Sequence, residues 1–209
     1  MAGGTAKRRV GVFGGTFDPV HLGHLVLAEQ CREQGRLDAV WFVPSPRPPH
    51  KGERAVTRFE QRVEMLSLAI AGNDAFRIDE VEKERAGPSY TADTLAELRR
   101  RHPADEFCLL IGSDTLVDLP GWYQPRRVVE SAALLVVRRP GHEVMPAEEL
   151  RARLQLSEPT PLRMVVVEAP LIDISSRDLR RRAAAGRSLR YFLPRAVEIY
   201  IQDKKLYHG

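Results

Sequence analysis

The chain has 209 residues, of which 43% are hydrophobic and 29% are charged. These proportions are typical of a globular protein with a buried core, and they exclude a disordered chain. No apolar run approaches the roughly 18 residues that a membrane span needs, so we expect no membrane contact. The start, MAGGTAKRRV, lacks the apolar segment of a secretory signal. A formal net charge of +4 favours an anionic partner, such as a nucleotide, a phosphate ester or a nucleic acid.

The two cysteines lie far apart in the sequence, Cys31 in a helical pattern and Cys108 in an apolar run of strand length. Such a distant pair does not indicate a disulfide framework. We therefore expect two buried free thiols, which indicate a reducing compartment and a cytoplasmic protein.

Apolar runs of strand length alternate with longer amphipathic segments, a pattern that predicts a parallel sheet with crossover helices. The expected strands cover residues 9–13, 40–43, 76–79, 107–111, 133–137 and 164–167. The expected helices cover residues 22–34, 57–71, 91–101 and 194–202, and another begins within 175–178 and ends at Gly186. The second of these helices begins with a capping box formed by Thr57 and Glu60.

This pattern predicts an α/β fold, a Rossmann-like open parallel sheet with helices on both faces. We expect a single domain over residues 1–209. Residues 1–8 are expected to form a loose N-terminal extension, and a helical C-terminal part is expected from about residue 175.

Two segments between these elements are expected to be functional loops. Segment 44–51 is rich in proline, which removes hydrogen-bond donors and excludes regular structure. Segment 112–124 follows a buried strand and contains Trp122 after a Pro-Gly pair. Because ligands of open α/β sheets bind at the carboxyl ends of the strands, we expect both segments to gather with Gly14–Gly15 at one edge.

The segment GGTFDPVHLGH, residues 14–24, follows the first expected strand. Gly14 and Gly15 allow a sharp turn and the close approach of a ligand, since neither carries a Cβ atom. Backbone N–H groups around Thr16 and Phe17 can then point at phosphate oxygens. The segment therefore predicts a polyphosphate site.

His21 and His24 lie three residues apart, so they share one face at the start of a helix, whose N-terminus carries partial positive charge. The surrounding glycines match neither a Walker A loop nor a dinucleotide fingerprint. A metal site is a weaker alternative, because helical zinc pairs usually stand four residues apart with a glutamate. Two exposed histidines without function are the other alternative.

Segment 14–24 resembles the signature of the HIGH-type nucleotidylyltransferase superfamily, and its HLGH end is the form found in adenylyltransferases. Segment 174–180, ISSRDLR, is similar to the superfamily's C-terminal I-S-S-T-x-I-R motif, with Arg177 where the family usually has threonine. Ser175 to Asp178 also match an ordinary helix capping box.

Three further segments resemble those of bacterial nicotinate-nucleotide adenylyltransferases. They are the proline-rich loop 43–51, the segment PSYTADTL at 88–95, and IGSDTL at 111–116 followed by Trp122 and Tyr123. The resemblance implies an enzyme that transfers the adenylyl group of ATP to nicotinate mononucleotide, giving deamido-NAD and pyrophosphate in NAD biosynthesis.

The resemblance also implies roles for individual residues. Those expected to act in catalysis are His21, His24, Lys51 and Arg180. Those expected to bind ATP are Gly14, Gly15, Thr16, Phe17, His21, His24, Gly112, Asp114, Ile174, Ser175, Ser176 and Arg180. Those expected to bind nicotinate mononucleotide are Thr16, His50, Lys51, Thr91, Trp122 and Tyr123. Mg²⁺ is expected to arrive with ATP, since no acidic cluster in the sequence offers a dedicated protein site.

Some residues and functions stay open. Asp114 suits a ribose diol or the cap of a helix, and Arg138 and Arg139 are weaker candidates for phosphate contacts. Nicotinamide mononucleotide or phosphopantetheine are alternative acceptors. The arginine-rich segment 177–190 suggests a basic nucleic-acid-binding module, but no RNA- or DNA-binding signature accompanies it, so we expect no nucleic-acid partner. A homo-oligomer is compatible with the sequence.

Overall fold

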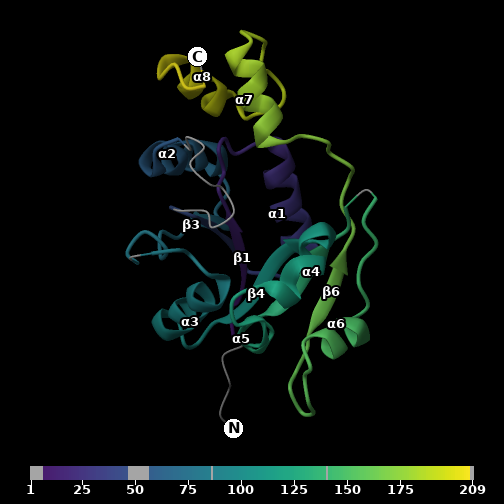
Figure 1. Ribbon diagram of the computed structural model, residues 1–209. Helices are drawn as coiled ribbons and strands as arrows, with labels where there is room; N and C mark the ends of the chain where they lie inside the picture. Colours follow the sequence, from purple (N-terminus) through teal and green to yellow (C-terminus); the bar gives the residue numbers. More distant parts are fainter. Residues whose placement is uncertain (1–6, 47–56, 86, 140, 208–209) are drawn as a thin grey trace.

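The computed structural model describes residues 7–46, 57–85, 87–139 and 141–207. Its centre is a six-stranded parallel sheet with the strand order β3-β2-β1-β4-β5-β6 (Figure 1). The strands are β1 (Arg9–Gly15), β2 (Ala39–Pro44), β3 (Phe76–Ile78), β4 (Glu106–Gly112), β5 (Ala133–Val137) and β6 (Met164–Val167). The strand order reverses between β1 and β4, which lie side by side, and this reversal is the arrangement expected of a Rossmann-like sheet.

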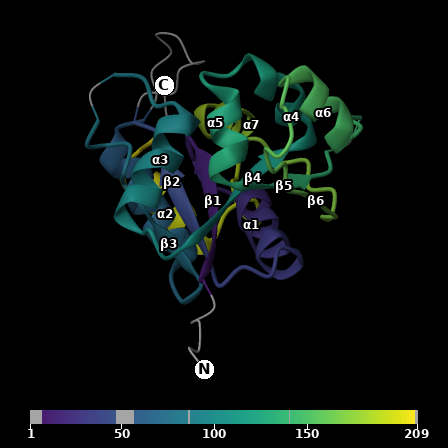
Figure 2. The same ribbon diagram turned by 90° about the horizontal axis from the view of Figure 1, so that it is seen from below.

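Helices cover both faces of the sheet (Figure 2). They are α1 (Leu22–Gln34), α2 (Phe59–Ile70), α3 (Thr91–Arg101), α4 (Ser113–Asp118), the 3₁₀ turn η1 (Leu119–Gly121), α5 (Pro125–Ser131), α6 (Ala147–Arg153), α7 (Ser176–Ala184) and α8 (Arg195–Asp203). Helices α1 and α2 pack against one face of the sheet, and α3 to α6 pack against the other. Helices α7 and α8 extend the hydrophobic cluster of α1 and α2 beyond the carboxyl ends of the strands, where α8 contacts α2 (Figure 1).

The strands are buried on both faces because each face is covered by helices. Alternate residues of β2 show this directly. Val40 and Phe42 enter the core under α1 and α2, whereas Ala39, Trp41 and Val43 enter the core under α3. A run of apolar residues without polar alternation is therefore the pattern expected of this strand.

The expected α/β fold is confirmed, and four expected elements agree with the structure to the residue, at 22–34, 91–101, 133–137 and 164–167. The expected buried free thiols of Cys31 and Cys108 are also confirmed. In the part of the chain that the structure describes, no helix is both long and apolar enough to cross a membrane.

The prediction of a capping box at Thr57 is wrong. Helix α2 begins two residues later, at Phe59, and its N-cap is Arg58, whose side chain makes no capping hydrogen bond. The backbone N–H of Thr57 instead donates to Oδ2 of Asp18 at 3.3 Å. A long-range contact therefore replaces the local one, and Thr57 ties the start of α2 to the loop after β1.

We expected segment 112–124 to be an open loop, and this prediction is wrong. Its first part forms α4 and the turn η1, so Pro120 and Gly121 lie within a 3₁₀ turn. Helices α5 and α6 were not expected either, because each has only seven residues and too few turns to show a helical period. At the C-terminus, Pro194 is the N-cap of α8 and not part of its first turn.

Candidate active site

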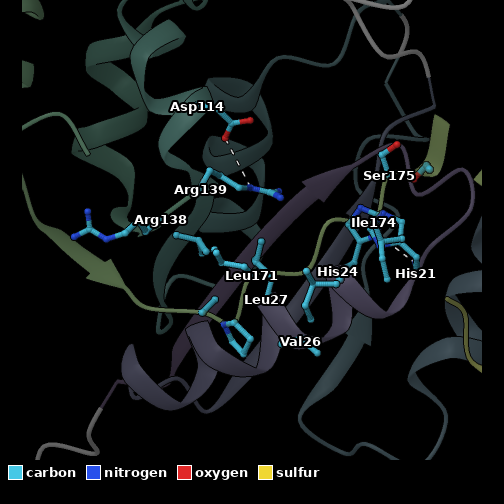
Figure 3. Close-up of a pocket in the computed structure, with 16 residues that line it drawn as sticks. His21, His24, Val26, Leu27, Asp114, Arg138, Arg139, Leu171, Ile174 and Ser175 are labelled. Atoms are coloured by element: carbon cyan, nitrogen blue, oxygen red, sulfur yellow. Dashed lines mark hydrogen bonds and ion pairs between the residues drawn. The ribbon is translucent and has the colours of Figure 1, made fainter. Parts of the chain in front are cut away.

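Two pockets open at the carboxyl ends of the strands, beside the point where the strand order reverses. We call the first the histidine pocket; it has a volume of about 300 Å³, and its wall includes His21, His24, Asp114, Arg139, Ile174 and Ser175 (Figure 3). We call the second the aromatic pocket; it has a volume of about 530 Å³, and its wall includes Gly14, Gly15, Glu82, Thr91, Trp122 and Tyr123. His24 and Arg139 belong to both walls, so the two pockets adjoin.

The two histidines stack on each other at the start of α1. His21 is the N-cap residue, and its backbone N–H donates to Nδ1 of His24 at 3.2 Å. The two ring centroids lie 3.7 Å apart with an interplanar angle of 27°. The ring of Phe17 packs edge-on against His24 at a centroid distance of 5.2 Å. The spacing of three residues thus does bring the two imidazoles together, and a buried aromatic ring holds His24 in place.

The side chain of His21 is buried, with only 6% of the residue exposed. Burial lowers the pKa of His21 to about 4, and the positive charge of Arg139 adds to this effect. Its Nδ1 atom is buried and makes no hydrogen bond with any residue in the described ranges. The protein by itself therefore favours the neutral form of this imidazole. A neutral imidazole here can gain a proton when an anion offsets these two effects.

The last two residues of β1, Gly14 and Gly15, leave room for different groups. A Cβ atom at Gly14 would meet no atom within 4 Å, and Gly14 lines the aromatic pocket. A Cβ atom at Gly15 would lie 2.8 Å from Cζ of Phe17. Phe17 has a left-handed backbone with φ of +50° and is 2% exposed. Gly14 therefore leaves room for a ligand, whereas Gly15 leaves room for the ring of Phe17.

The start of α7 closes the histidine pocket on another side. Ser175 is the N-cap, and its hydroxyl accepts from the N–H of Asp178 at 3.1 Å and donates to Oδ2 of the same residue at 2.7 Å. The hydroxyl of Ser176 donates to the carbonyl oxygen of Pro19 at 2.9 Å. Ser175 thus caps α7 through its hydroxyl, which is one of the two bonds of the capping box that the sequence offered as an alternative, and both serines line the pocket.

Asp114 and Arg139 face each other across the histidine pocket, with Nε of Arg139 3.9 Å from Oδ1 of Asp114 (Figure 3). Asp114 lies in the first turn of α4, and the N-cap of that helix is Gly112. A Cβ atom at Gly112 would lie 2.2 Å from Oδ1 of Asp114, so a larger residue there would displace this carboxylate. The pair places one acceptor and one cation where β4 and β5 end.

The aromatic pocket has a ring-lined end. The rings of Tyr90 and Tyr123 lie against each other in a tilted arrangement, at a centroid distance of 4.5 Å and an interplanar angle of 32°. Trp122 packs partly against the core under α3 to α6, and Thr91 is the first residue of α3. This end of the pocket suits a flat heteroaromatic ring.

The fold and the pockets can be set beside known proteins. A model of the cytidylyltransferase-like family matches residues 12–182. A protein of Thermomicrobium roseum, named "Probable nicotinate-nucleotide adenylyltransferase", is 45% identical over 199 residues, which cover 95% of this chain and 91% of that protein. A protein of the same name from Thermus thermophilus is 45% identical over 199 residues, which cover 95% of this chain and 99% of that one.

The chain belongs to the nicotinate-nucleotide adenylyltransferase family. Accordingly, it is an enzyme, an ATP-dependent nucleotidyltransferase that acts in NAD biosynthesis. The solved structure of Plasmodium falciparum nicotinic acid mononucleotide adenylyltransferase complexed with NaAD is 18% identical and superposes with a TM-score of 0.76 over 96% of this chain and 97% of that one. This likeness shows that the two proteins share the fold.

Most of the residues that the family resemblance singled out lie around the two pockets, with four exceptions. Phe17 lines neither pocket and packs in the core. Arg180 lines neither pocket, and its guanidinium donates to the carbonyl oxygen of Asp18 at 2.6 Å. His50 and Lys51 lie outside the described residues.

The importance of two residues at the pockets, Arg139 and Glu82, was not identified from the sequence. Arg139 was a weaker candidate, although its position after β5 was a usable signal, and it lies where the two pockets meet. Glu82 was not singled out, because it follows the short strand β3 and belongs to no motif that we used. No group of three or more His, Cys, Asp or Glu side chains that could hold a metal ion occurs among the described residues.

Proposed function

We propose that the histidine pocket binds ATP, that the aromatic pocket binds nicotinate mononucleotide, and that the adenylyl group passes between them beside His24. The observation that carries this assignment is that His24 and Arg139 line both pockets. A reaction between two bound substrates needs their reacting atoms in contact, so it has to occur where the two sites adjoin.

In the proposed reaction, a phosphate oxygen of nicotinate mononucleotide attacks the α-phosphorus of ATP. A new P–O bond forms to give deamido-NAD, the bond to the β-phosphate bridging oxygen breaks, and pyrophosphate leaves. The protein need form no covalent bond, because positioning and neutralisation of charge account for most catalysis of phosphoryl-type transfer. His21, His24 and Arg139 are placed to stabilise the negative charge that develops on the phosphate oxygens.

We propose Mg–ATP as the form of the nucleotide that binds. Mg²⁺ is commonly held by substrate phosphates together with water and few protein ligands. The absence of a metal-ligating cluster among the described side chains is compatible with a metal that arrives on the triphosphate.

Further roles follow from position. Asp114 and Gly112 are proposed to contact the adenosine ribose. The phosphates of ATP are proposed to contact Ile174, Ser175 and Ser176. Gly14, Gly15 and Thr16 are proposed to border the phosphates between the two pockets, and Thr91, Trp122 and Tyr123 to hold the nicotinate ring. His50 and Lys51, outside the described residues, stay proposed as phosphate ligands on the proline-rich loop.

For Phe17 and Arg180 we propose positioning roles, since their contacts in the structure are with the protein and neither lines a pocket. Phe17 supports the ring of His24, and Arg180 fixes the loop that leads to His21. We further propose that the reaction takes place in the cytoplasm, where the thiols of Cys31 and Cys108 stay reduced.

The direct test is release of pyrophosphate with Mg–ATP, with nicotinate mononucleotide and nicotinamide mononucleotide offered in separate reactions. We expect a strong preference for the acid. Equal use of both would keep the reaction and refute the assignment of the nicotinate ring to Thr91, Trp122 and Tyr123. No release with either would refute the proposed acceptor and direct the assay to phosphopantetheine.

A second test addresses the place of transfer. Replacing His24 by alanine is expected to lower kcat about a hundredfold, the usual effect of losing one preorganised donor. His142→Ala is the control, because that side chain is exposed and lines neither pocket. Near-normal turnover in His24→Ala, with the fold intact, would refute the role of His24.

A further inference from the structure

Glu82 is a buried carboxyl group in the wall of the aromatic pocket. Only 7% of the residue is exposed. Its Oε1 atom accepts a hydrogen bond from the hydroxyl of Thr94, on the first turn of α3, at 2.8 Å. Its Oε2 atom is buried and has no hydrogen-bond partner in the described part of the chain. One oxygen of this carboxyl group thus accepts a hydrogen bond from the protein, and the other is available to a ligand.

A second buried polar atom lies in the same wall. The hydroxyl of Ser45 is buried and makes no hydrogen bond of ordinary geometry with any described residue, but it lies close enough to the carboxyl of Glu82 to lower the pKa of that group. The backbone N–H of Ser45 donates to the carbonyl oxygen of Gly15 at 2.9 Å, which fixes Ser45 beside the loop after β1. A buried polar atom without a well-formed hydrogen bond costs up to about 1–3 kcal/mol, and a hydroxyl group of a bound ligand can supply the missing partner for Oε2.

The position of Glu82 in the pocket indicates which part of a ligand it meets. The pocket runs from Gly14 and Gly15, the proposed phosphate end, to Trp122 and Tyr123, the ring end. Glu82 is held by Thr94 on α3 and lies near Ser45 beside Gly15, so it stands between these two ends. In a mononucleotide, the group between phosphate and base is the ribose.

The chemistry of the carboxyl agrees with this placement. Burial raises the pKa of Glu82, while the neighbouring hydroxyls of Thr94, Ser89 and Ser45 and the charge of Arg85 act in the opposite direction. A phosphate or a nicotinate carboxylate would be repelled by a carboxylate here, whereas a neutral hydroxyl can donate to it.

We propose that Oε2 of Glu82, assisted by the hydroxyl of Ser45, accepts a hydrogen bond from a ribose hydroxyl of the bound mononucleotide and so selects ribonucleotides over deoxyribonucleotides. This inference rests on the proposed assignment of the aromatic pocket to the mononucleotide. It makes Glu82 a specificity-determining residue of that site.

The test compares kcat/KM for nicotinate mononucleotide with its 2′-deoxy and 3′-deoxy analogues, at saturating Mg–ATP. Wild type is expected to use at least one analogue about ten- to a hundredfold less well, the usual loss for a hydrogen bond to a charged group. Glu82→Met removes both oxygens and approximately keeps the volume, and it should reduce this discrimination to about threefold or less. The KM for ATP should not change.

Thr94→Val is the matched control. It removes the contact to Oε1 and leaves Oε2 in place, so it should keep the discrimination of wild type even if it weakens the start of α3. Should Glu82→Met fail to fold, Ser45→Ala, which removes one hydroxyl, must lower the discrimination about two- to tenfold.

Two outcomes would overturn the inference. Wild type could use the ribose and deoxyribose substrates equally, or Glu82→Met could keep the wild-type discrimination. Either would leave the proposed function standing, since both require turnover of nicotinate mononucleotide. If wild type does not turn over this substrate at all, the proposed function fails, and the assignment of Glu82 fails with it.

Discussion

The hydroxyl of Tyr207 donates a hydrogen bond of 2.7 Å to Oδ1 of Asp18, a residue 189 positions earlier in the chain. Asp18 is 2% exposed and lies in the loop between β1 and His21. The backbone N–H of Thr57 donates to the other carboxylate oxygen at 3.3 Å, and Arg180 donates to the carbonyl oxygen of Asp18 at 2.6 Å. Three distant segments thus fix the loop that leads into the histidine pocket.

Tyr207→Phe is expected to lower the unfolding free energy by about 1–3 kcal/mol, because Oδ1 of Asp18 stays buried and loses its donor. We also expect kcat to fall several-fold while the KM for ATP changes little, since the variant loosens the loop before His21 and removes no substrate contact. Urea unfolding and steady-state kinetics measure the two effects. Tyr191→Phe, at a residue that is 79% exposed, should change neither. Equal behaviour of the two variants would contradict the prediction.

Arg62 binds backbone oxygens of three residues that are distant from one another in the sequence. It is 1% exposed, and its guanidinium donates to the carbonyl oxygens of Thr16 at 2.7 Å, Ser45 at 2.9 Å and Thr57 at 3.0 Å. Arg62→Met leaves these oxygens without their donor, so we expect a loss of about 3–5 kcal/mol in unfolding free energy.

Activity should fall as well, because Thr16 and Ser45 line the aromatic pocket. Arg58→Met, at an exposed position one turn earlier, is the control and should stay within about 0.5 kcal/mol of wild type. A loss below about 1 kcal/mol in Arg62→Met would show that other donors or water replace the guanidinium.

Replacement by alanine is expected to have opposite effects at Gly14 and Gly15, the last two residues of β1. Gly15→Ala brings a methyl group to 2.8 Å from the buried ring of Phe17 and should cost about 1–3 kcal/mol of stability through overpacking. Gly14→Ala meets no atom within 4 Å and should keep the stability of wild type. Its methyl group enters the aromatic pocket, so the KM for the mononucleotide should rise about tenfold. Thermal unfolding and kinetics of both variants test this pair, and a reversed order would be evidence against it.

The buried imidazole of His21 makes stability depend on pH. Its pKa is lowered to about 4 in the folded protein, against about 6.5 in an unfolded chain. Between these values the unfolded chain binds a proton that the folded protein does not, so stability is complete above pH 6.5 and falls as the pH drops toward 4. We expect this residue to contribute about 3 kcal/mol to that loss.

His21→Asn removes the titrating group, so its unfolding free energy should fall less than that of wild type between pH 7 and pH 4, by about 3 kcal/mol. Urea unfolding at a series of pH values measures the difference, with His142→Asn as the reference for replacing an exposed imidazole. Parallel curves for wild type and His21→Asn would contradict the assigned pKa direction.

Features that depend on neighbouring residues could be predicted from the sequence. Helix 22–34 was predicted to the residue, because the glycine and proline pattern that precedes it is local. The spacing of His21 and His24 similarly predicted their proximity, since three residues in a helical turn bring side chains to one face. Thr57 shows the limit, because its expected local cap gave way to a contact with Asp18, 39 residues away.

The sequence by itself determined the α/β fold class and the family, and it predicted where a phosphate site would lie. Only the tertiary structure decided that Arg139 lies beside His24 between two pockets, that Glu82 is buried with one oxygen unused, and that Tyr207 supports Asp18. The physical reason is that burial and hydrogen-bond pairing depend on atoms brought together from distant segments, and no local pattern of residues records which segments meet.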